Sequence, residues 1–287
     1  MKLGAFTTFT PEYTFPEACK MIKALGYDGV QPRIVPANSA SFDPSKPFNP
    51  WGNNKGGVSE TDFFADPKGA LKPVTDLGLE VSSVASYCGA ADMDRAVKMA
   101  QACGKAGIKN VRLGTIPKPQ EAIFDYATYI ERARGSYKEL VAEAKKVGVR
   151  PCLELHAGNA FPGPSGTIAF LKGFSPDDVG VLFDPANMAH EGWEPMPLSL
   201  NIIDAYLAEI HVKNVEWVKG PVDAKGTQTW KVANCAMEAG FVNWGEVIDL
   251  LKARGFKGWL VEEGHVEDQT SYVRLKTAYE YLKKLLG

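Results

Sequence analysis

The stretch Arg150-Pro151-Cys152-Leu153-Glu154-Leu155-His156 has the composition of a buried strand, and it carries a carboxylate and an imidazole near its end. Side chains alternate across a strand, so Glu154 and His156 point to the same face. An ionised carboxylate within an apolar strand is costly to desolvate unless a cation, a metal ion or several hydrogen-bond donors meet it. The stretch therefore predicts a strand that ends in a polar site, and it is the first hint of a metal ion.

Three later stretches have the same form, a hydrophobic run that ends in a side chain able to bind a metal ion. They are Val181-Leu182-Phe183-Asp184, Ala208-Glu209-Ile210-His211 and Trp259-Leu260-Val261-Glu262-Glu263. Four strand ends in succession thus offer oxygen or nitrogen ligands.

Strand patterns alternate with helical patterns along the whole chain, and glycines recur between a helix and the next strand. We predict strands over residues 2–7, 28–33, 79–85, 110–114, 150–156, 179–184, 209–214 and 258–263, and helices over 14–25, 67–77, 92–106, 120–147, 167–171, 198–207, 246–253 and 271–286. The 120–147 helix has a weak point at Gly135-Ser136. These βα units predict a closed (β/α)₈ TIM barrel, formed as a single domain by residues 1–287.

A doubly wound open sheet is the alternative to the barrel. Such a sheet normally has a glycine-rich phosphate turn after its first strand, and Phe6-Thr7-Thr8-Phe9-Thr10 is not one.

Two long connections show no clear strand or helix pattern. Residues 34–66 contain several prolines and the glycine-rich stretch Trp51-Gly52-Asn53-Asn54-Lys55-Gly56-Gly57, and a second loop is predicted from residue 215 to Asn243. A structureless stretch as long as the first is usually a functional loop in a compact domain. The alternative is a surface excursion without a role. In the functional case, Trp51 forms a wall of the substrate pocket.

The composition excludes several classes of partner. The net charge is -2 and no dense Lys/Arg run occurs, so nucleic acid finds little electrostatic attraction. No apolar run of about 18 residues occurs and no signal-peptide pattern follows Met1, so we expect a cytoplasmic protein without a membrane segment. The five cysteines have no CxxC spacing, which favours reduced, packed thiols.

The carboxyl ends of barrel strands form the active site in this fold. Glu154, Asp184, His211 and Glu263 would therefore meet there as three carboxylates and one imidazole, a set that suits Mn²⁺, Mg²⁺ or Co²⁺ better than a thiol-rich zinc site does. We expect the site to bind one divalent ion, with Mn²⁺ as the first choice. The alternatives are a buried ion-pair network and, at the last position, Glu262 in place of Glu263. All four histidines lie in or just beyond the last four strands, namely His156, His190, His211 and His265.

These motifs, taken in order, resemble the xylose-isomerase-like sugar phosphate isomerase/epimerase superfamily across essentially the whole barrel. The matching segments are Leu153-Glu154-Leu155-His156, Phe183-Asp184-Pro185-Ala186-Asn187-Met188, Ile210-His211-Val212-Lys213-Asn214 and Gly258-Trp259-Leu260-Val261-Glu262-Glu263. The resemblance implies that Glu154, Asp184, His211 and Glu263 bind one cation. In that superfamily the last Glu stands five residues after a strand-opening Gly, which selects Glu263. The Gly258-Trp259-Leu260-Val261 stretch also resembles inosose dehydratases, which eliminate water from a keto-inositol.

The chain also departs from parts of that superfamily. Ketose 3-epimerases carry a His three residues after the strand-six Asp, a Glu six residues after the strand-five Glu and an Arg six residues after the strand-seven His. Here these positions hold Asn187, Ala160 and Trp217, which disfavours a free-ketose 3-epimerase. The DNA-repair endonucleases of the superfamily need further histidines for extra zinc ions and a DNA-binding face, and neither is visible.

A divalent cation that holds two adjacent oxygens of a polyol ketone acidifies the neighbouring C–H and stabilises the resulting enediolate. Reprotonation then gives epimerisation or isomerisation, whereas loss of a β-oxygen gives dehydration or glycoside cleavage. By resemblance, Glu154 and Glu263 act as bases as well as ligands. His156 shares a strand face with Glu154, and Lys213 shares one with His211, so both are further acid/base candidates. The alternatives are a core histidine bonded to a carbonyl and a lysine on a solvated barrel rim.

Three more residues at strand ends are candidate substrate contacts, together with Trp51: Arg112, Asn187 and His190. Each has the alternative role of capping a loop. The leading interpretation is a metal-dependent isomerase or epimerase of a small carbohydrate, a sugar or keto-sugar. The alternatives are a lyase of the same superfamily, a keto-inositol dehydratase or 3-keto-glycoside eliminase, and a barrel that only binds a carbohydrate. A homo-oligomer is compatible with the tyrosines of the last helix.

Overall fold

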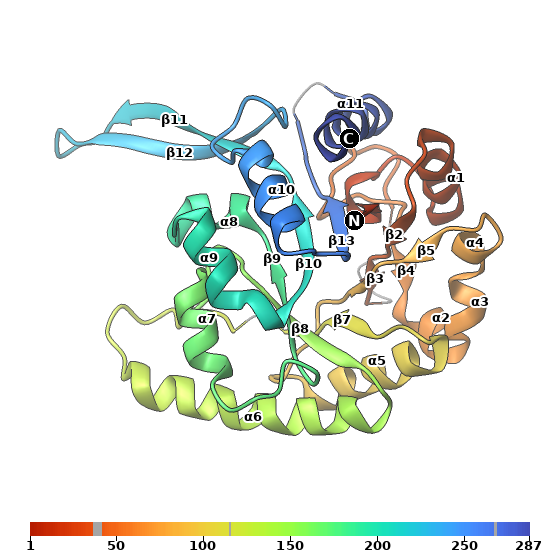
Figure 1. Ribbon diagram of the computed structural model, residues 1–287, viewed down its shortest axis with the longest axis horizontal. Helices are drawn as coiled ribbons and strands as arrows, with labels where there is room; N and C mark the ends of the chain where they lie inside the picture. Colours follow the sequence, from red (N-terminus) through yellow and green to blue (C-terminus); the bar gives the residue numbers. More distant parts are fainter. Residues whose placement is uncertain (37–41, 115, 267–268) are drawn as a thin grey trace.

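The computed structural model describes residues 1–36, 42–114, 116–266 and 269–287, and its centre is a nine-stranded sheet. The strands follow one another in the order β5-β2-β1-β13-β10-β9-β8-β7-β6, and each pairing within the sheet is parallel. Their bounds are β1 Lys2–Phe6, β2 Gly29–Gln31, β5 Glu80–Val81, β6 Val84–Ala85, β7 Asn110–Arg112, β8 Arg150–Glu154, β9 Gly180–Phe183, β10 Leu207–Val212 and β13 Trp259–Glu262. Figure 1 shows the strands surrounded by helices.

The first and last strands in this order, β5 and β6, belong to one continuous stretch of the chain. β5 and β6 are separated only by Ser82 and Ser83, and a further parallel bridge joins Ala85 to Arg33, just beyond β2. The sheet therefore returns to its starting edge, and the predicted TIM barrel with one domain is confirmed.

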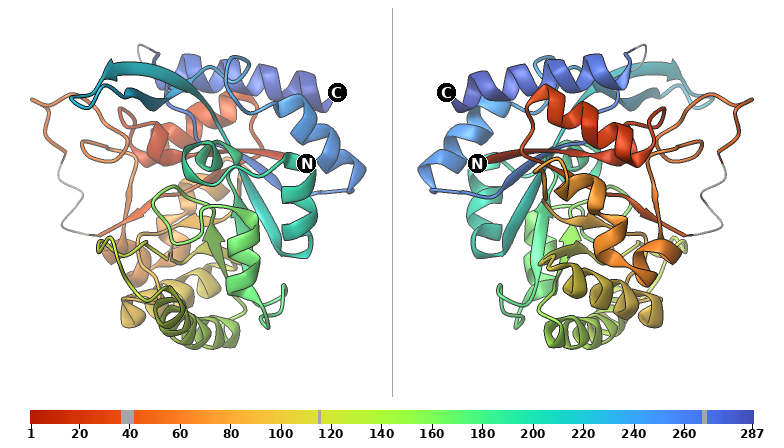
Figure 2. Two further views of the ribbon diagram at one scale, coloured as in Figure 1. Left: turned by 90° about the vertical axis from the view of Figure 1, so that its left-hand side faces the viewer. Right: turned by 90° about the vertical axis from the view of Figure 1, so that its right-hand side faces the viewer.

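Helices cover the outside of the barrel between successive strands. Their bounds are α1 Phe15–Leu25, α2 Glu60–Ala65, α3 Pro67–Ala70, α4 Lys72–Thr75, α5 Met93–Ala106, α6 Tyr126–Lys146, α7 Pro164–Leu171, α8 Pro185–Glu191, α9 Met196–Ile203, α10 Trp244–Ala253 and α11 Ser271–Leu286. Figure 2 shows α11, in blue, and α6, in yellow-green, on opposite sides of the barrel. None of the helices in the described ranges is long and apolar enough to span a bilayer.

Several predicted helices differ from the observed ones. α6 is unbroken at Gly135-Ser136, because Tyr137, Leu140 and other residues of the next turns are buried against the barrel and outweigh a glycine cost of about 1 kcal/mol. The predicted 67–77 helix is divided into α3 and α4, and α4 begins at Lys72 with Pro73 as its second residue. The predicted 198–207 helix ends at Ile203 and continues as a 3₁₀ turn. α8 was not predicted.

The two stretches predicted as loops contain regular structure, which corrects both predictions. Within 34–66, of which 37–41 lie outside the described residues, β3 (Ile34–Val35) pairs with β4 (Val58–Ser59), and α2 follows. After β10, β11 (Asn214–Val222) and β12 (Gln228–Cys235) form an antiparallel hairpin that extends away from the barrel (Figure 1). Most of its side chains are exposed or half-buried, so it lacks the apolar alternation that marks a packed strand.

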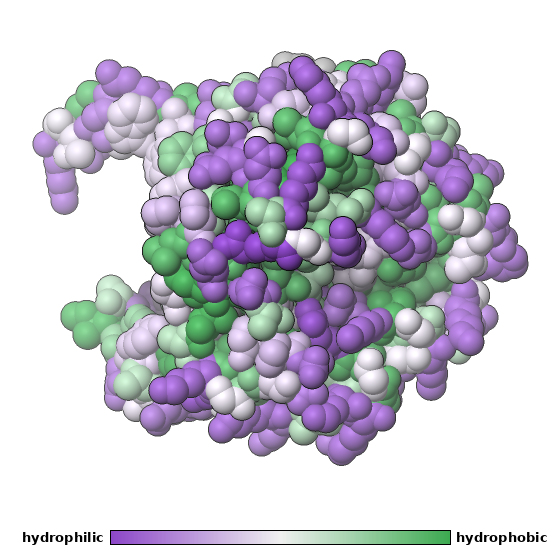
Figure 3. Space-filling view, viewed as in Figure 1, coloured by the Kyte–Doolittle hydropathy of each residue, from purple (hydrophilic) through white to green (hydrophobic). Residues whose placement is uncertain are grey.

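The space-filling view shows that the face seen in Figure 1 is mostly hydrophilic (Figure 3). Hydrophobic residues gather at a notch between the projecting hairpin and the segment that precedes α6. The hairpin and this segment both follow strand ends, so they extend the side of the barrel where the strands finish.

The end of β13 directs two adjacent glutamates to different surroundings. Glu262 is buried and accepts hydrogen bonds from Arg274 of α11 and from Gly264 N, the latter at 3.0 Å. Arg274 Nη2 also donates to Phe9 O at 2.6 Å. The Glu262–Arg274 pair therefore ties α11 to the barrel and leaves Glu263 to face the barrel mouth.

We predict that Arg274→Ala lowers the free energy of unfolding by about 3–5 kcal/mol, because it leaves the buried Glu262 carboxylate without its positively charged partner. The double variant Glu262→Leu with Arg274→Met should cost much less, since neither charge remains. Urea unfolding followed by circular dichroism measures both. Equal losses in the single and double variants would contradict this role of the pair.

Candidate metal centre

The four ligand-type side chains predicted from the strand ends lie together in the barrel mouth. Glu154 ends β8, Asp184 follows β9, His211 lies in β10 and Glu263 follows β13. All four are buried, and one possible ligand atom from each lies within 4.8 Å of the others. The strands are parallel neighbours, so residues far apart in the sequence converge at one end of the sheet.

His211 faces the carboxylates with one ring nitrogen. Its Nδ1 lies 3.1 Å from Glu154 Oε1 and 2.6 Å from Glu263 Oε2. The ring of Phe6 stacks beside the imidazole with centroids 6.2 Å apart. Nδ1 is therefore the nitrogen that can join a shared cation with the two glutamates.

The other nitrogen of His211 faces a buried polar group inside the barrel. Nε2 lies 3.5 Å from Glu209 Oε1 and 3.1 Å from Gln31 Nε2. Glu209 Oε1 accepts hydrogen bonds from Gln31 Nε2 at 2.6 Å and Ser83 Oγ at 2.9 Å. When Nδ1 binds a cation, Nε2 carries the ring proton, and Glu209 is the carboxylate that faces it.

Asp184 is held by the first turn of α8. Its Oδ1 accepts a hydrogen bond from Asn187 N at 2.9 Å, so it is the N-cap of that helix, and Oδ2 accepts one from Asn187 Nδ2 at 2.6 Å. Pro185 occupies the first helical position, where its missing N–H has no cost. Oδ1 keeps a lone pair for a further partner.

Two permanent cations border the group. Arg112 Nε lies 3.0 Å from Glu154 Oε2, and Lys213 Nζ lies 2.7 Å from Asp184 Oδ2 and 2.8 Å from Glu263 Oε1. Burial by itself lowers the pKa of Lys213, but the two carboxylates outweigh it and raise the pKa well above its usual value. Lys213 is therefore an ammonium ion in this arrangement.

The same neighbours keep two of the carboxyl groups ionised. Burial alone raises the pKa of Glu154, but Arg112 and a hydrogen bond from His211 lower it well below its usual value. For Glu263, the effect of burial is likewise overcome by His211 and Lys213, and the pKa is lowered.

The donor set fits a divalent cation. Glu154 Oε2 lies 3.0 Å from Arg112 Nε and Glu263 Oε2 lies 2.6 Å from His211 Nδ1, yet neither oxygen accepts an aligned hydrogen bond from the described part of the chain. With Glu209 included, four carboxyl groups lie near two permanent cations, Arg112 and Lys213. With all four ionised and His211 neutral, two negative charges are left, which a divalent ion would balance. Without the ion, burial lowers the pKa of His211, but Glu263, Glu154 and Glu209 outweigh it and raise the pKa, so the imidazolium supplies part of this positive charge. The buried cluster can therefore hold such an ion.

A cavity of about 300 Å³ adjoins this cluster at Glu263. It contains most of the residues that the sequence predicts for catalysis or substrate binding, namely Trp51, His156, Asn187, His190, Lys213 and Glu263. His265 is also on its wall. Glu154 and Arg112 are the exceptions: Glu154 lies within the cluster, and Arg112 contacts Glu154 but lines a neighbouring cavity. The roles of these residues stay predictions.

The two predicted acid/base side chains have defined neighbours. His156 is half-buried, and its Nδ1 lies 2.7 Å from Ala157 O, which can only accept, so Nδ1 donates. Its Nε2 is then free of that hydrogen when the ring is neutral, and His156 lines the cavity. Burial and the charge of Lys213 lower the pKa of His190 on the same wall.

Sequence reasoning missed the polar group behind His211. Glu209 stands two residues before His211 and thus on the same strand face, a signal that was available. Gln31 and Ser83 carry no such signal, because only barrel closure brings their strands opposite β10. Asn49 and Asn234, which line the cavity, come from the two stretches predicted as loops.

A parallel (β/α)₈ barrel with a buried carboxylate and histidine cluster at its mouth defines the class to which this protein is assigned. The chain belongs to the xylose isomerase-like TIM barrel family, whose model matches residues 19–285.

Individual relatives of known function are distant. Inosose dehydratase of Histophilus somni (strain 129Pt) is 26% identical over 159 residues, which cover 50% of this chain and 50% of that protein. The chain thus matches about half the length of this curated relative. The solved structure of D-psicose 3-epimerase with D-tagatose from Clostridium cellulolyticum H10 has a TM-score of 0.70 at 15% identity, covering 100% of this chain and 99% of that one.

A second solved structure, a xylose isomerase-like TIM barrel protein from Mycobacterium smegmatis in complex with magnesium, has a TM-score of 0.65 at 18% identity. It covers 99% of this chain and 96% of that one. At these identities the solved structures confirm the fold alone.

We predict that Glu209→Gln weakens Mn²⁺ binding by about 10- to 100-fold, because the carboxylate that faces the outer nitrogen of a ligating histidine orients that histidine. Isothermal titration of the metal-free protein measures the affinity. Glu216→Gln, on the exposed face of β11, is the matched control and should bind like the wild type. Wild-type affinity in Glu209→Gln would contradict the role assigned to this residue.

Proposed function

We propose that the protein is a divalent-metal-dependent isomerase or epimerase of a sugar or keto-sugar. One observation carries this proposal: three carboxylates and one imidazole are buried with their ligand atoms within 4.8 Å, beside a cavity with polar walls. Burying such a group is costly unless a cation balances it. The cavity volume of about 300 Å³ suits a small molecule.

Glu154, Asp184, His211 and Glu263 would hold the ion, with Mn²⁺ as our first choice and Mg²⁺ or Co²⁺ as alternatives. The magnesium in the Mycobacterium smegmatis structure supports an oxygen-preferring divalent ion. When bound, the ion would supply positive charge next to a substrate carbonyl and hydroxyl, which acidifies the C–H between them.

The remaining steps belong to the protein's own side chains. Glu154 and Glu263 are the proposed bases, because both carboxylates belong to the cluster beside the cavity and Glu263 also lines that cavity. Lys213 is charged, so we assign it to donating a hydrogen bond to a substrate oxygen and to fixing Glu263 at 2.8 Å. His156 is the proposed acid/base on another wall, with Nε2 as the atom that exchanges the proton.

Three further residues would position the substrate. Asn187 and His190 line the cavity near Lys213, and Trp51 closes it from the segment before β4. The ring of Trp51 packs edge-on to Phe9 with centroids 5.4 Å apart. Such an aromatic wall can cover the apolar face of a sugar and exclude water from the reacting carbon. Arg112 would act through Glu154, which it contacts directly.

A lyase of the same type is the second candidate, either a keto-inositol dehydratase or a 3-keto-glycoside eliminase. The similarity to inosose dehydratases supports it. Asn187, Ala160 and Trp217 also occupy the positions where ketose 3-epimerases carry His, Glu and Arg. A cytoplasmic location and a homo-oligomeric state complete the proposal.

Proton exchange in D₂O distinguishes the candidates. We predict that the Mn²⁺-loaded protein, incubated with free ketoses, keto-inositols and 3-keto-glycosides, incorporates deuterium next to the carbonyl of its substrate without loss of water or aglycone. Nuclear magnetic resonance of the products measures this. An unsaturated product would replace the isomerase by the lyase. If the protein binds a carbohydrate but shows no deuterium exchange and no response to EDTA, both enzyme proposals are wrong and it is a carbohydrate-binding barrel.

The two histidines should separate metal binding from turnover. We predict that His211→Ala loses both the metal and the activity, whereas His156→Ala keeps the metal and loses turnover, because His156 lies in the cavity but outside the ligand cluster. Metal content by mass spectrometry and steady-state rates measure the two effects. Full activity in His156→Ala would remove it from the mechanism.

A further inference from the structure

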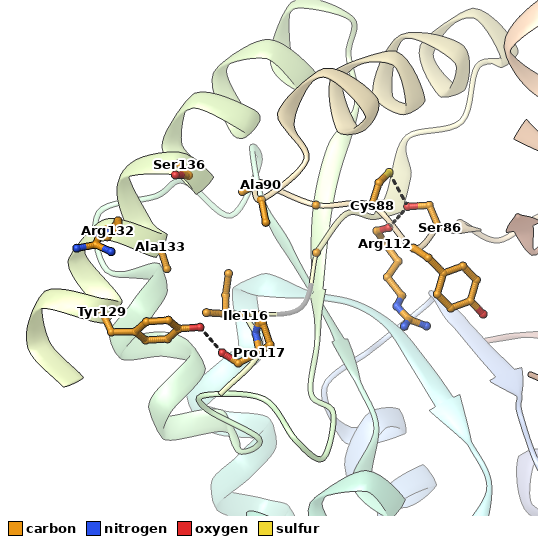
Figure 4. A pocket seen from close by; sticks show the side chains of 14 residues that line it. Ser86, Cys88, Ala90, Arg112, Ile116, Pro117, Tyr129, Arg132, Ala133 and Ser136 are labelled. Carbon is orange, nitrogen blue, oxygen red and sulfur yellow. Dashed lines mark hydrogen bonds between the residues drawn. The ribbon is translucent and has the colours of Figure 1, made fainter. Parts of the chain in front are cut away.

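A second cavity, of about 470 Å³, lies beside the metal centre (Figure 4). The loops that follow β6 and β7 form two of its walls, and the first half of α6 forms the third. In Figure 4, Ala90 comes from the loop after β6, Ile116 from the loop after β7, and Tyr129 and Ala133 from α6. These loops follow strand ends, so the cavity lies on the same side of the barrel as the metal centre.

The two cavities share a boundary made of three side chains. Arg112 lines the second cavity, and its Nε lies 3.0 Å from Glu154 Oε2 in the metal centre. The Tyr87 ring, also part of this wall, has its centroid 5.5 Å from Arg112 Cζ and 6.4 Å from the ring centroid of Trp51. Trp51 lines the first cavity. The two cavities therefore lie on either side of this boundary.

The chemistry of the second cavity differs from that of the first. Its walls carry apolar and aromatic side chains, and among the described residues no carboxylate or carboxamide lines it. The first cavity contains Asn49, Asn187 and Asn234, the kind of side chain that binds sugar hydroxyls. The charged groups of the second cavity are the guanidinium groups of Arg112 and Arg132. Such walls suit a flat aromatic group, and they suit one with a polar or acidic edge better than one with a basic edge.

The volume of the second cavity also favours a ligand with an additional group beyond a monosaccharide. The first cavity, at about 300 Å³, already has the volume of a small-ligand pocket, so a free monosaccharide leaves the second unused. The aromatic wall is also fixed, because the hydroxyl of Tyr129 donates to Pro117 O and holds its ring in place (Figure 4). A rigid apolar wall favours a ligand that is itself rigid and apolar.

We propose that the second cavity binds the aromatic aglycone of a glycoside whose sugar ring lies at the metal centre. This inference rests on the proposed carbohydrate site, and it names the substrate class as an aryl glycoside or its keto form. A free ketose would occupy only the first cavity. Selectivity between the two substrate types would then come from apolar contacts with Tyr129, Ile116 and Ala133.

Equilibrium binding of two glycosides with the same sugar tests the proposal. The probes are 4-nitrophenyl β-D-glucopyranoside and methyl β-D-glucopyranoside, titrated into the Mn²⁺-loaded protein by calorimetry. We predict that the aryl glycoside binds about tenfold or more tightly, because burial of its ring adds apolar contact that the methyl group lacks. Ala133→Phe, which fills the cavity from α6, should remove this preference without changing the metal content.

Two further variants control the test. Ala90→Phe fills the cavity from the loop after β6 and should give the same loss, so the result does not depend on whether one variant folds. Ala142→Phe lies on α6 outside this cavity and should keep the wild-type preference. Absence of an aryl preference in the wild type, or a preference that survives in a folded cavity-filling variant, overturns the proposal.

The outcome is separate from that of the proposed reaction. Binding of these probes needs no turnover, so a protein that lacks isomerase and lyase activity still reports on the cavity. Conversely, a protein that exchanges deuterium into a ketose but shows no aryl preference keeps its proposed reaction and loses only the aglycone site.

Discussion

The burial of several carboxylates beside one imidazole is the constraint on which the rest of this structure depends. Glu154, Asp184 and Glu263 are almost completely withdrawn from water at the barrel mouth. Their mutual repulsion in a medium of low polarity is large, and it is tolerated only where positive charge is built in or bound. Arg112 and Lys213 supply part of that charge. The remaining deficit suits the cluster to a bound divalent cation.

The surrounding fold supplies the rigidity that such a site needs. Adjacent glutamates at the end of β13 are committed to different partners, Glu262 to Arg274 of α11 and Glu263 to the cluster. The N-cap interaction of α8 fixes Asp184, and the polar group around Glu209 fixes the outer side of His211. Asp184 and His211 are thus each held by a contact outside the cluster, which keeps these donors in place before a cation or substrate arrives.

Much of the fold was predictable from the sequence, because the signals for its strands and helices lie within short segments. Strands such as 150–156 and 179–184 are buried on both faces and have continuous apolar runs, and α1 has the capping box of Thr14 and Glu17 and a C-cap at Gly26 with φ 97°. The positions of Glu154, Asp184, His211 and Glu263 followed from the rule that parallel strand ends converge. Glu263 was chosen over Glu262 by resemblance, and the geometry places it with the other three.

The parts that could not be predicted depend on contacts between distant segments or on weak local patterns. The hairpin of β11 and β12 has two largely exposed faces, so its sequence lacks a burial period, although Asp223 and Gly226 mark its turn. The cavity beside Arg112 exists only because α6 packs at a distance from the loops after β6 and β7. No single stretch of the sequence predicts this space between α6 and the two loops.

Anomalous X-ray scattering from crystals grown with Mn²⁺ tests the central claim most directly, because it locates the ion independently of the surrounding density. The account predicts one strong manganese peak bonded to Glu154, Asp184, His211 and Glu263, with Lys213 displaced from at least one of its carboxylates. A map with no peak in the barrel mouth, in which these side chains still bind only one another, Arg112 and Lys213, would contradict it.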